Sequence, residues 1–292
     1  MKIISIKRSD PKYPKNLRDT YDPPEVLYVN GELLPQDEAA VALVGTRRPT
    51  YYGMQACEKL SYDLALYGIT IVSGMARGID TAAHRGALKA GGRTIAVLGS
   101  GHDNIYPKEN KKLYEEITKS GAVVSEFPDD TPPYKWNFPQ RNRVISGLSL
   151  GVVVIEAPKK SGALITVDFA LEQGREVFAM PGKVNSLASE GTHQLIKDGA
   201  KLVENANDII EELEIKLKKF LKENKTKENN LLLDEKEEEI CRFLTDEPKH
   251  IDEIALESKI PVNKVLSVLT QLVIKRVVKE LPGKKFIAPT RR

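Results

Sequence analysis

The sequence predicts an α/β protein: a doubly wound, Rossmann-like parallel sheet followed by a small C-terminal winged helix-turn-helix domain. Three observations predict it. From about residue 39 to 204, short runs rich in valine and isoleucine alternate with helix-like segments, which is typical of a parallel sheet. Those runs are apolar at consecutive positions, as expected for strands covered on both faces. The 292 residues also suffice for one full-sized domain and a smaller one.

The elements follow in order along the chain. Residues 1–38 contain five prolines and are expected to form an extended N-terminal segment packed on the main domain, which is predicted over residues 39–210. Helix-like segments such as GMQACEKLSYDLALYG and DTAAHRGALKAGG separate the predicted strands. The strand-like runs are VALVG (41–45), ITIVSG (69–74), TIAVLG (94–99), GAVVSEF (121–127), GVVVIEA (151–157) and EVFAMPG (176–182).

A change of composition marks the second domain. Of residues 211–240, 17 of 30 are charged, and KENKTKENN has no apolar periodicity, so residues 211–233 are predicted as a charged helix and linker. Residues 234–292 are predicted as the winged helix-turn-helix: EKEEEICRFLT, HIDEIALESK and a helix that starts after Pro261, then a hairpin turning at Pro282 and Gly283.

Composition excludes several classes of protein. The chain carries 44 basic and 41 acidic residues, so any nucleic-acid face must come from local clustering. Cys57 and Cys241 lie far apart without a CxxC pattern, which argues against a disulfide framework or a structural zinc site. We find no signal peptide and no window that approaches a membrane span. We therefore expect a soluble cytoplasmic protein without metal or cofactor.

Four of the predicted strands are followed by loops of similar composition. These loops contain small residues and glycine, and most of them contain basic residues. Glycine lets the backbone approach a ligand, hydroxyl and helix-start N–H groups favour an anion, and arginine matches phosphate oxygens. Glycines also serve tight turns, but their combination with several arginines favours a phosphate-binding rim. Neither GxGxxG nor a P-loop is present. The rim residues are Gly45, Thr46, Arg47 and Arg48; Ser73, Gly74, Arg77 and Gly78; Gly99 and Gly101; and Ser161, Gly162 and Thr166 after Lys159 and Lys160.

The stretch NFPQRNRVISG places two arginines and an asparagine, Arg141, Asn142 and Arg143, just before a buried strand. We expect all three to project onto the same strand-end edge and contact phosphates. Trp136 and Phe138 lie just upstream and are candidates for stacking on bases. For both aromatic residues core packing is the alternative, and it is the favoured one for Phe138.

Candidate catalytic residues are scarce. His84 lies in an amphipathic stretch and is expected to pack against the sheet rather than transfer protons. Glu126 and Glu156 end strands and are expected to hold arginines or cap helix N–H groups. Among the rim arginines Arg77 is the weakest candidate, because a local salt bridge to Asp80, three residues on, is the alternative to a phosphate contact. No catalytic residue is predicted.

The blocks VALVGTRRPTYYG, SGMARGIDTAAH, TIAVLGSGHDNIYPKEN, SEFPDDTPPYKWNFPQRNRVISGLSLGVVVIEA, SGALIT and GREVFAMPG resemble, in order, the signature blocks of the DNA-processing protein A family (DprA, also called Smf). The resemblance covers about residues 10–210. It implies an extended Rossmann-like domain that binds single-stranded DNA, forms a homodimer and loads the recombinase RecA in natural transformation, without enzymatic activity. The sequence departs from the family at three positions. The family usually has Ser at the position of Thr46 and often Ser at that of Ala163. At the position of Asp168 the family often has a basic or small residue.

The resemblance also matches His193, Ile196 and Leu202 to the family's dimer interface. His193 and Ile196 are three residues apart and therefore share one helix face, whereas Leu202 belongs to the strand that follows. The alternative is that Ile196 and Leu202 pack inward. A symmetric contact through one apolar patch is the commonest way to close such an edge.

Two other functions compete with the DNA-binding mediator. A phosphoribohydrolase acting on nucleoside monophosphates shares this kind of fold, but it carries PGGxGTxxE with a catalytic glutamate, whereas here the region reads KKSGALITVDFA. A transcription factor would read duplex DNA with the winged helix, near Lys275, Arg276, Lys284 and Lys285. Residues 232–292 hold 12 basic and 11 acidic residues, a weak electrostatic footprint, so the tail is open to protein or DNA partners.

Overall fold

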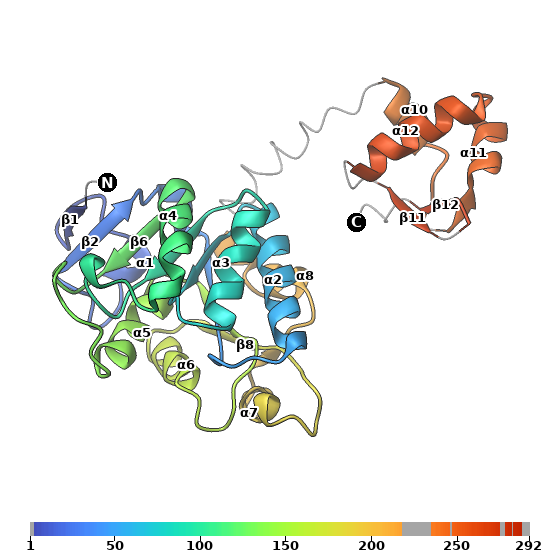
Figure 1. Ribbon diagram of the computed structural model, residues 1–292. Coiled ribbons are helices and arrows are strands. Elements are labelled where there is room, and N and C mark those ends of the chain that lie inside the picture. Colours follow the sequence, from blue (N-terminus) through green and yellow to red (C-terminus); the bar gives the residue numbers. More distant parts are fainter. Residues whose placement is uncertain (1–2, 218–234, 246, 275–277, 282, 288–292) are drawn as a thin grey trace. The chain divides into compact units, whose positions relative to one another are not determined.

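The computed structural model describes residues 3–217, 235–245, 247–274, 278–281 and 283–287. They belong to two compact units, Met1–Asn224 and Lys225–Arg292. In the described part of the first unit, a nine-stranded sheet is covered by helices on both faces (Figure 1). The predicted doubly wound sheet is confirmed. The division between the units falls inside the predicted stretch 211–233, most of which lies outside the described residues.

The sheet has the strand order β1-β2-β6-β5-β4-β3-β7-β8-β9. All neighbours from β6 to β9 are parallel, whereas β2 is antiparallel to β6 and β1 is antiparallel to β2. The strands are β1 (Ile4–Lys7), β2 (Val26–Gly31), β3 (Ala40–Val44), β4 (Thr70–Ser73), β5 (Thr94–Val97), β6 (Ala122–Ser125), β7 (Gly151–Val154), β8 (Glu176–Ala179) and β9 (Lys201–Leu202).

The N-terminal segment is part of the sheet, whereas the sequence predicted an extended segment packed on it. β1 and β2 form the antiparallel edge, and Leu27 and Val29 are buried in the core. The alternation of buried and less buried residues in VLYVN is the strand pattern that explains this pairing. The prolines of the segment lie outside both strands, so none of them removes a donor from the sheet.

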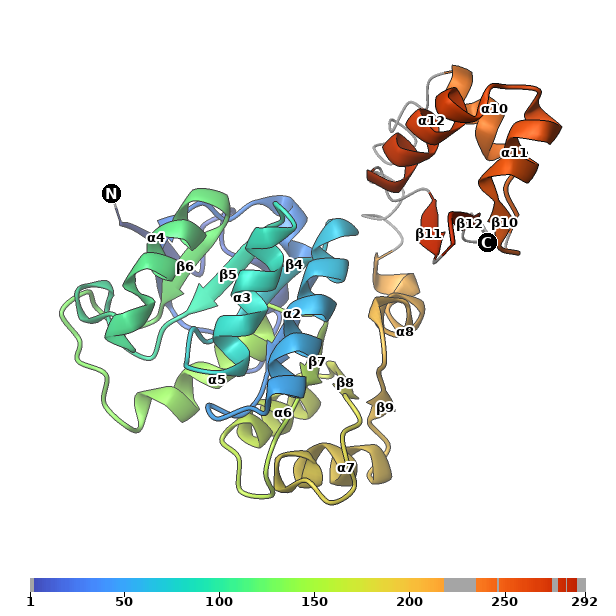
Figure 2. The ribbon, with the colours of Figure 1, turned by 45° about the vertical axis from the view of Figure 1, so that its right-hand side comes forward.

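Helices cover both faces of the sheet. α2, α3 and α8 share one core with Val41 and Leu43 of β3, while α1, α5 and α6 share the opposite core with Ala42 and Val44. Figure 2 shows α2 and α3 together on one side of the sheet. This alternation explains why β3 is apolar at every position: each fully buried valine or leucine contributes about 1.5–3 kcal/mol. The helices are α1 (Lys15–Arg18), α2 (Tyr51–Leu66), α3 (Ile79–Lys89), α4 (Lys111–Ser120), α5 (Asn137–Gly147), α6 (Ala163–Glu172), α7 (Glu190–Lys197) and α8 (Ala206–Glu212), with short 3₁₀ turns η1 (Pro35–Glu38), η2 (His102–Asn104), η3 (Lys108–Asn110) and η4 (Leu187–Ser189).

The strand order reverses between β3 and β7. From β3 the chain builds outward through β4, β5 and β6, and it then returns to β7 and builds the other side through β8 and β9. Because α2 and α6 follow adjacent strands onto opposite faces, the loops before them diverge. In open α/β sheets, ligands bind in the crevice that this divergence leaves at the carboxyl ends of the strands.

The second unit contains three helices and a three-stranded sheet with the order β10-β12-β11 among its described residues. Its core includes Ile254, Leu269 and Phe286. Gly283 has φ +80°, as the predicted hairpin turn requires, whereas Pro282, Lys275 and Arg276 lie outside the described residues. The elements are α10 (Glu235–Cys241), β10 (Lys249–His250), α11 (Ile251–Ser258), α12 (Val262–Ile274), β11 (Lys279–Leu281) and β12 (Lys285–Ile287).

Candidate nucleic-acid interface

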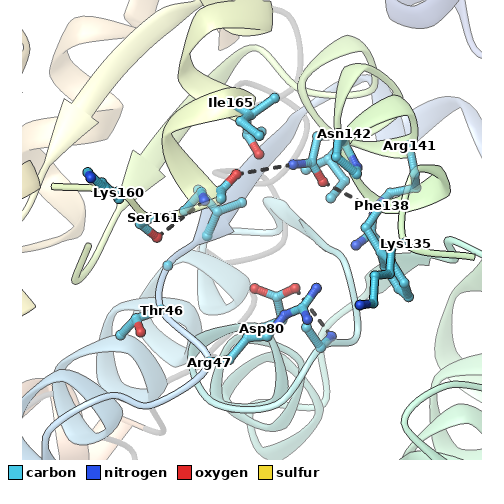
Figure 3. Close-up of a pocket in the computed structure, with 18 of the residues that line it drawn as sticks. Thr46, Arg47, Asp80, Lys135, Phe138, Arg141, Asn142, Lys160, Ser161 and Ile165 are labelled. Atoms are coloured by element: carbon cyan, nitrogen blue, oxygen red, sulfur yellow. Dashed lines mark hydrogen bonds between the residues drawn. The ribbon is translucent and has the colours of Figure 1, made fainter. Parts of the chain in front are cut away.

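A cavity of about 860 Å³ lies at the point where the strand order reverses (Figure 3). We call it the switch-point cavity. Its walls come from the loop after β3, the loop after β7, the first turns of α5 and the start of α6. The residues that line it are Val44, Gly45, Thr46, Arg47, Arg48, Ala76, Asp80, Tyr106, Pro133, Lys135, Phe138, Pro139, Arg141, Asn142, Ile145, Pro158, Lys160, Ser161, Gly162, Ala163, Ile165 and Thr166.

The structure divides the predicted rim into two groups. Ten predicted residues line the cavity: Gly45, Thr46, Arg47, Arg48, Phe138, Arg141, Asn142, Ser161, Gly162 and Thr166. Eight others are not among its lining residues: Ser73, Gly74, Arg77, Gly78, Gly99, Gly101, Trp136 and Arg143. The cavity therefore draws mainly on the loops of the two switch-point strands, and the segments after β4 and β5 contribute Ala76, Asp80 and Tyr106 to its lining.

Glycines behind the cavity allow other groups to approach closely. Gly78 has φ +78°, and a Cβ there would lie 2.5 Å from the Thr46 carbonyl oxygen. A Cβ on Gly99 would lie 2.7 Å from Cδ1 of Phe138. These two positions thus support the loop that carries Arg47 and the aromatic ring beneath it, which is the packing alternative for such glycines.

Arg141 lines the cavity but is only 3% exposed. Its Nη1 donates to the carbonyl oxygens of Gly74, at 2.8 Å, and Val97, which tie the ends of β4 and β5 together. Burial lowers the pKa of Arg141 to about 10, and the Asp80 carboxylate opposes that change. The guanidinium therefore has a structural role, because its hydrogen bonds hold two strand ends together. It is not the freely projecting phosphate ligand that the sequence predicted.

Asp80 lines the cavity, and it does not form the local salt bridge to Arg77 that was the alternative considered from the sequence. It accepts a hydrogen bond from the Ala76 N–H at 3.2 Å, and burial raises its pKa against the opposing effects of Arg141 and Arg47. Arg77 extends to Glu109 and pairs with it instead. A partner that lies 32 residues along the chain cannot be recognised from proximity in sequence.

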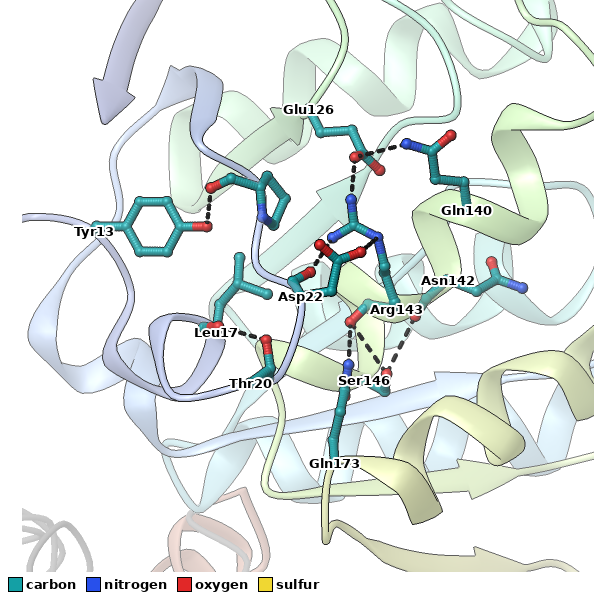
Figure 4. Close-up of polar contacts among 11 residues, drawn as sticks. Tyr13, Leu17, Thr20, Asp22, Glu126, Gln140, Asn142, Arg143, Ser146 and Gln173 are labelled. Carbon is teal, nitrogen blue, oxygen red and sulfur yellow. Dashed lines mark hydrogen bonds and ion pairs between the residues drawn. The ribbon is translucent and has the colours of Figure 1, made fainter. Parts of the chain in front are cut away.

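Arg143 is not among the residues that line the cavity, and it belongs instead to a group of polar contacts with Glu126 and Asp22 (Figure 4). Its side chain is 11% exposed and pairs with Glu126 at 2.5 Å and with Asp22 at 3.4 Å. Its Nη1 also donates to the Asp22 carbonyl oxygen at 2.6 Å. Arg141 and Arg143 are two residues apart on α5, so they point about 200° apart around the helix. The prediction that both face the same edge is wrong for this reason.

Glu126 and Glu156 have the structural roles expected for them. Glu156 is 2% exposed and accepts hydrogen bonds from the Thr50 N–H at 2.8 Å and the Thr50 hydroxyl at 2.6 Å. Thr50 in turn caps α2 by accepting from the Gly53 N–H. Glu156 therefore fixes the start of the helix behind Arg47 and Arg48, and Glu126 holds Arg143.

Four basic side chains remain at the cavity: Arg47, Arg48, Lys135 and Lys160. They are exposed, and none forms a salt bridge within the described residues. Arg47 lies over the Phe138 ring, with its guanidinium carbon 5.2 Å from the ring centroid. Unpaired cations around a concave site concentrate a positive field that attracts polyanions. The sequence did not predict Lys135 as a site residue, because it does not lie in one of the glycine-containing loops that follow the strands.

The one histidine considered as a possible catalytic base lies away from the cavity, in the core. His84 is fully buried, its Nδ1 lies 2.7 Å from the Thr94 hydroxyl, and burial lowers its pKa to about 3. His84 is therefore a neutral core residue near pH 7, as predicted. Among the described residues we find no metal-type cluster of His, Cys, Asp and Glu, and no helix long and apolar enough to cross a membrane.

The predicted dimer residues lie at one edge of the sheet. His193 and Ile196 are on α7 and are half-buried, and Leu202 on the edge strand β9 is 43% exposed. The His193 Nε2 lies 3.0 Å from the Gly182 carbonyl oxygen. Leu202 does not pack inward in the isolated chain, so that alternative is wrong for this residue.

The fold and site define a Rossmann-like protein with a cationic cavity at its switch point and a separate C-terminal helical unit. Two family models match: DNA recombination-mediator protein A over residues 4–214, and the DprA winged helix domain over residues 225–284. The chain therefore belongs to the DNA recombination-mediator protein A family, and its second unit is a winged helix domain, as predicted.

Named relatives agree with this assignment. The chain is 47% identical to the Bacillus subtilis DNA processing protein DprA over 212 residues, which is 72% of this chain and 71% of the relative. It is 41% identical to the Escherichia coli protein Smf over 278 residues, 93% of this chain and 74% of the relative. The solved Streptococcus pneumoniae DprA matches with a TM-score of 0.69 and 45% identity, covering 73% and 75% of the two chains.

A further solved structure carries functional information about a relative. It is the Helicobacter pylori DNA processing protein A, reported for its unique single-stranded DNA binding mode. It matches with a TM-score of 0.65 and 34% identity, covering 73% of this chain and 96% of the relative.

Proposed function

We propose that this protein binds single-stranded DNA with its backbone in the switch-point cavity. The observation that carries the proposal is the set of four unpaired cations, Arg47, Arg48, Lys135 and Lys160, around a cavity whose position in the fold is that of a ligand site. The single-strand binding reported for the Helicobacter pylori relative supports it. Thr46 and Ser161, from the loops after β3 and β7, also line the cavity and offer hydroxyls to phosphate oxygens.

The proposed role is that of a recombination mediator in the cytoplasm: it protects incoming single strands and loads RecA onto them in natural transformation. Family membership supports this role. It is tested by RecA-dependent ATP hydrolysis on strands already covered by a single-strand-binding protein. Hydrolysis that does not increase when this protein is added would overturn the role in loading.

We propose no enzymatic activity. In the phosphoribohydrolase alternative a glutamate must activate the scissile bond, but Glu156 is committed to Thr50, and His84 is buried and neutral near pH 7. Release of free base from nucleoside monophosphates, lost in the Glu156→Gln variant, would favour the enzyme instead.

The binding mode is tested by comparing single strands with duplexes of equal length, using the full chain and a chain that ends at residue 224. We expect tighter binding to single strands, kept in the shortened chain, because the switch-point cavity lies entirely in the first unit. Mobility shifts or anisotropy of labelled DNA measure this. Duplex preference that disappears with residues 225–292 would indicate a DNA-reading winged helix instead.

We also propose a symmetric homodimer through His193, Ile196 and Leu202. Leu202 is 43% exposed on the edge strand, where a second copy would cover it. Sedimentation equilibrium should report a dimer for the native chain and a folded monomer for the Ile196→Glu, Leu202→Arg variant. Because two cavities in one particle hold a long strand at two places, the variant should bind long strands more weakly and short strands equally well. A native monomer at micromolar concentration would contradict the proposal.

A further inference from the structure

Two exposed aromatic rings are stacked beside the switch-point cavity. Trp136, which is the single tryptophan of the chain, is 66% exposed, and Tyr134 is 44% exposed. Their ring centroids are 4.7 Å apart and their planes differ by 7°. Each ring thus already covers one face of the other, and an outer ring face is left to solvent. Core packing, the alternative considered for Trp136 from the sequence, does not account for this exposure.

The loop that carries the two rings is held in place by backbone and amide hydrogen bonds. Asn137 is 3% exposed, and it donates through Nδ2 to the Pro132 carbonyl oxygen and through its N–H to the Tyr134 carbonyl oxygen. Upstream, the Gly101 N–H donates to the Thr131 carbonyl oxygen at 2.9 Å. The stack is therefore preorganised, and ordering it on binding costs little entropy.

The stack is continuous with the cavity. Lys135, between the two aromatic residues in sequence, and Pro133 both line the cavity, as does Phe138 two residues after Trp136 (Figure 3). Phe138 differs from Trp136 because its ring is covered: it packs against Gly99, lies 5.6 Å from the Tyr106 ring and carries the Arg47 guanidinium. Its contacts suit a residue that positions Arg47, whereas Trp136 has a face available for a base.

We infer that the Tyr134–Trp136 stack is a platform that receives one unpaired base of a DNA strand directly outside the switch-point cavity. This inference rests on the proposed function. Every base has a flat π-face, so the platform accepts any sequence, and stacking of one base is expected to raise affinity about tenfold. A duplex cannot offer a base without unpairing it, so the platform also makes the protein discriminate single strands from duplexes.

The intrinsic fluorescence of Trp136 can report base stacking directly. Adding a short oligo-dT to the native chain is expected to quench the fluorescence of Trp136, whereas an equal-length oligonucleotide with abasic sites is expected to bind through its phosphates without the same quenching. Anisotropy of a labelled strand measures binding independently in both cases. Binding with unchanged fluorescence, or equal quenching by the abasic strand, would overturn the platform and leave the proposed function standing.

Substitutions at the stack provide a second, independent test of the platform. Trp136→Ala is expected to weaken binding of oligo-dT about tenfold and of the abasic strand hardly at all, and Trp136→Phe, which keeps a stacking ring, should retain most of the affinity. Tyr21→Ala removes a 99% exposed aromatic ring outside the cavity lining and serves as the matched control. Unchanged dT affinity in a folded Trp136→Ala protein would overturn the inference. Absence of any single-strand binding by the native chain would overturn the proposed function itself.

Discussion

Replacing Arg47 and Lys160 together by alanine is expected to weaken the binding of single-stranded DNA by about tenfold or more for each of the two cations, because each removes a charge-assisted hydrogen bond to a phosphate. Both side chains line the switch-point cavity, and neither has a salt-bridge partner among the described residues. Each cation that neutralises a phosphate releases a counterion, so the slope of log K against log salt should become less steep by about 0.7 per residue, or about 1.4 for the pair. Anisotropy of a labelled dT strand at several salt concentrations measures both quantities.

The matched control removes the same two charges elsewhere. Arg85 and Lys119 are exposed residues of α3 and α4 that do not line the cavity, so the Arg85→Ala, Lys119→Ala variant should keep the native slope. Equal losses in the two double variants would show that only net charge matters, and they would remove the case for a site at the switch point.

Replacing Arg143 by alanine is expected to lower the free energy of unfolding by about 3–5 kcal/mol, because the change strands the charge of Glu126 in a buried position. The two side chains are 11% and 6% exposed. In the native protein, burial raises the pKa of Glu126 and the Arg143 guanidinium opposes that rise. Without Arg143 the pKa rises further, so Glu126 favours the folded state only while it is protonated. The defect should therefore grow as the pH rises above about 4.3, the pKa of a glutamate in the unfolded chain.

Urea denaturation of Arg143→Ala and of the exposed control Arg48→Ala measures this difference, and the control should change stability by less than about 0.5 kcal/mol. Adding Glu126→Gln to Arg143→Ala should restore part of the stability. The folded fraction should keep the native salt slope for single strands. A fully stable Arg143→Ala protein with a reduced slope would return Arg143 to the phosphate site.

The sequence predicts the parallel sheet well because burial on both faces is a local property. β3 and β7 are apolar at every position, and both are recognisable without knowing their neighbours. The loops at Gly45 and Ser161 are predictable for the same reason, since the carboxyl ends of parallel strands share one edge. The edge strands β1 and β2 lie in a segment that contains five prolines, and they were not predicted.

The site residues that the sequence misplaced depend on partners far along the chain. Arg77 pairs with Glu109, and Arg143 pairs with Glu126 and Asp22, all brought together only by the tertiary fold. The opposite directions of Arg141 and Arg143 do follow from helix periodicity, once the stretch is taken as helical through both residues. Lys135 has no local signal, because its place at the cavity depends on the fixed loop before α5.

The salt dependence of single-strand binding by the unaltered chain tests the central claim most directly. If the phosphodiester backbone occupies the switch-point cavity and meets Arg47, Arg48, Lys135 and Lys160, log K for a short dT strand should fall linearly with log salt, with a slope of about −3 for four neutralised phosphates. A slope near zero, with binding that persists at high salt, would contradict the claim.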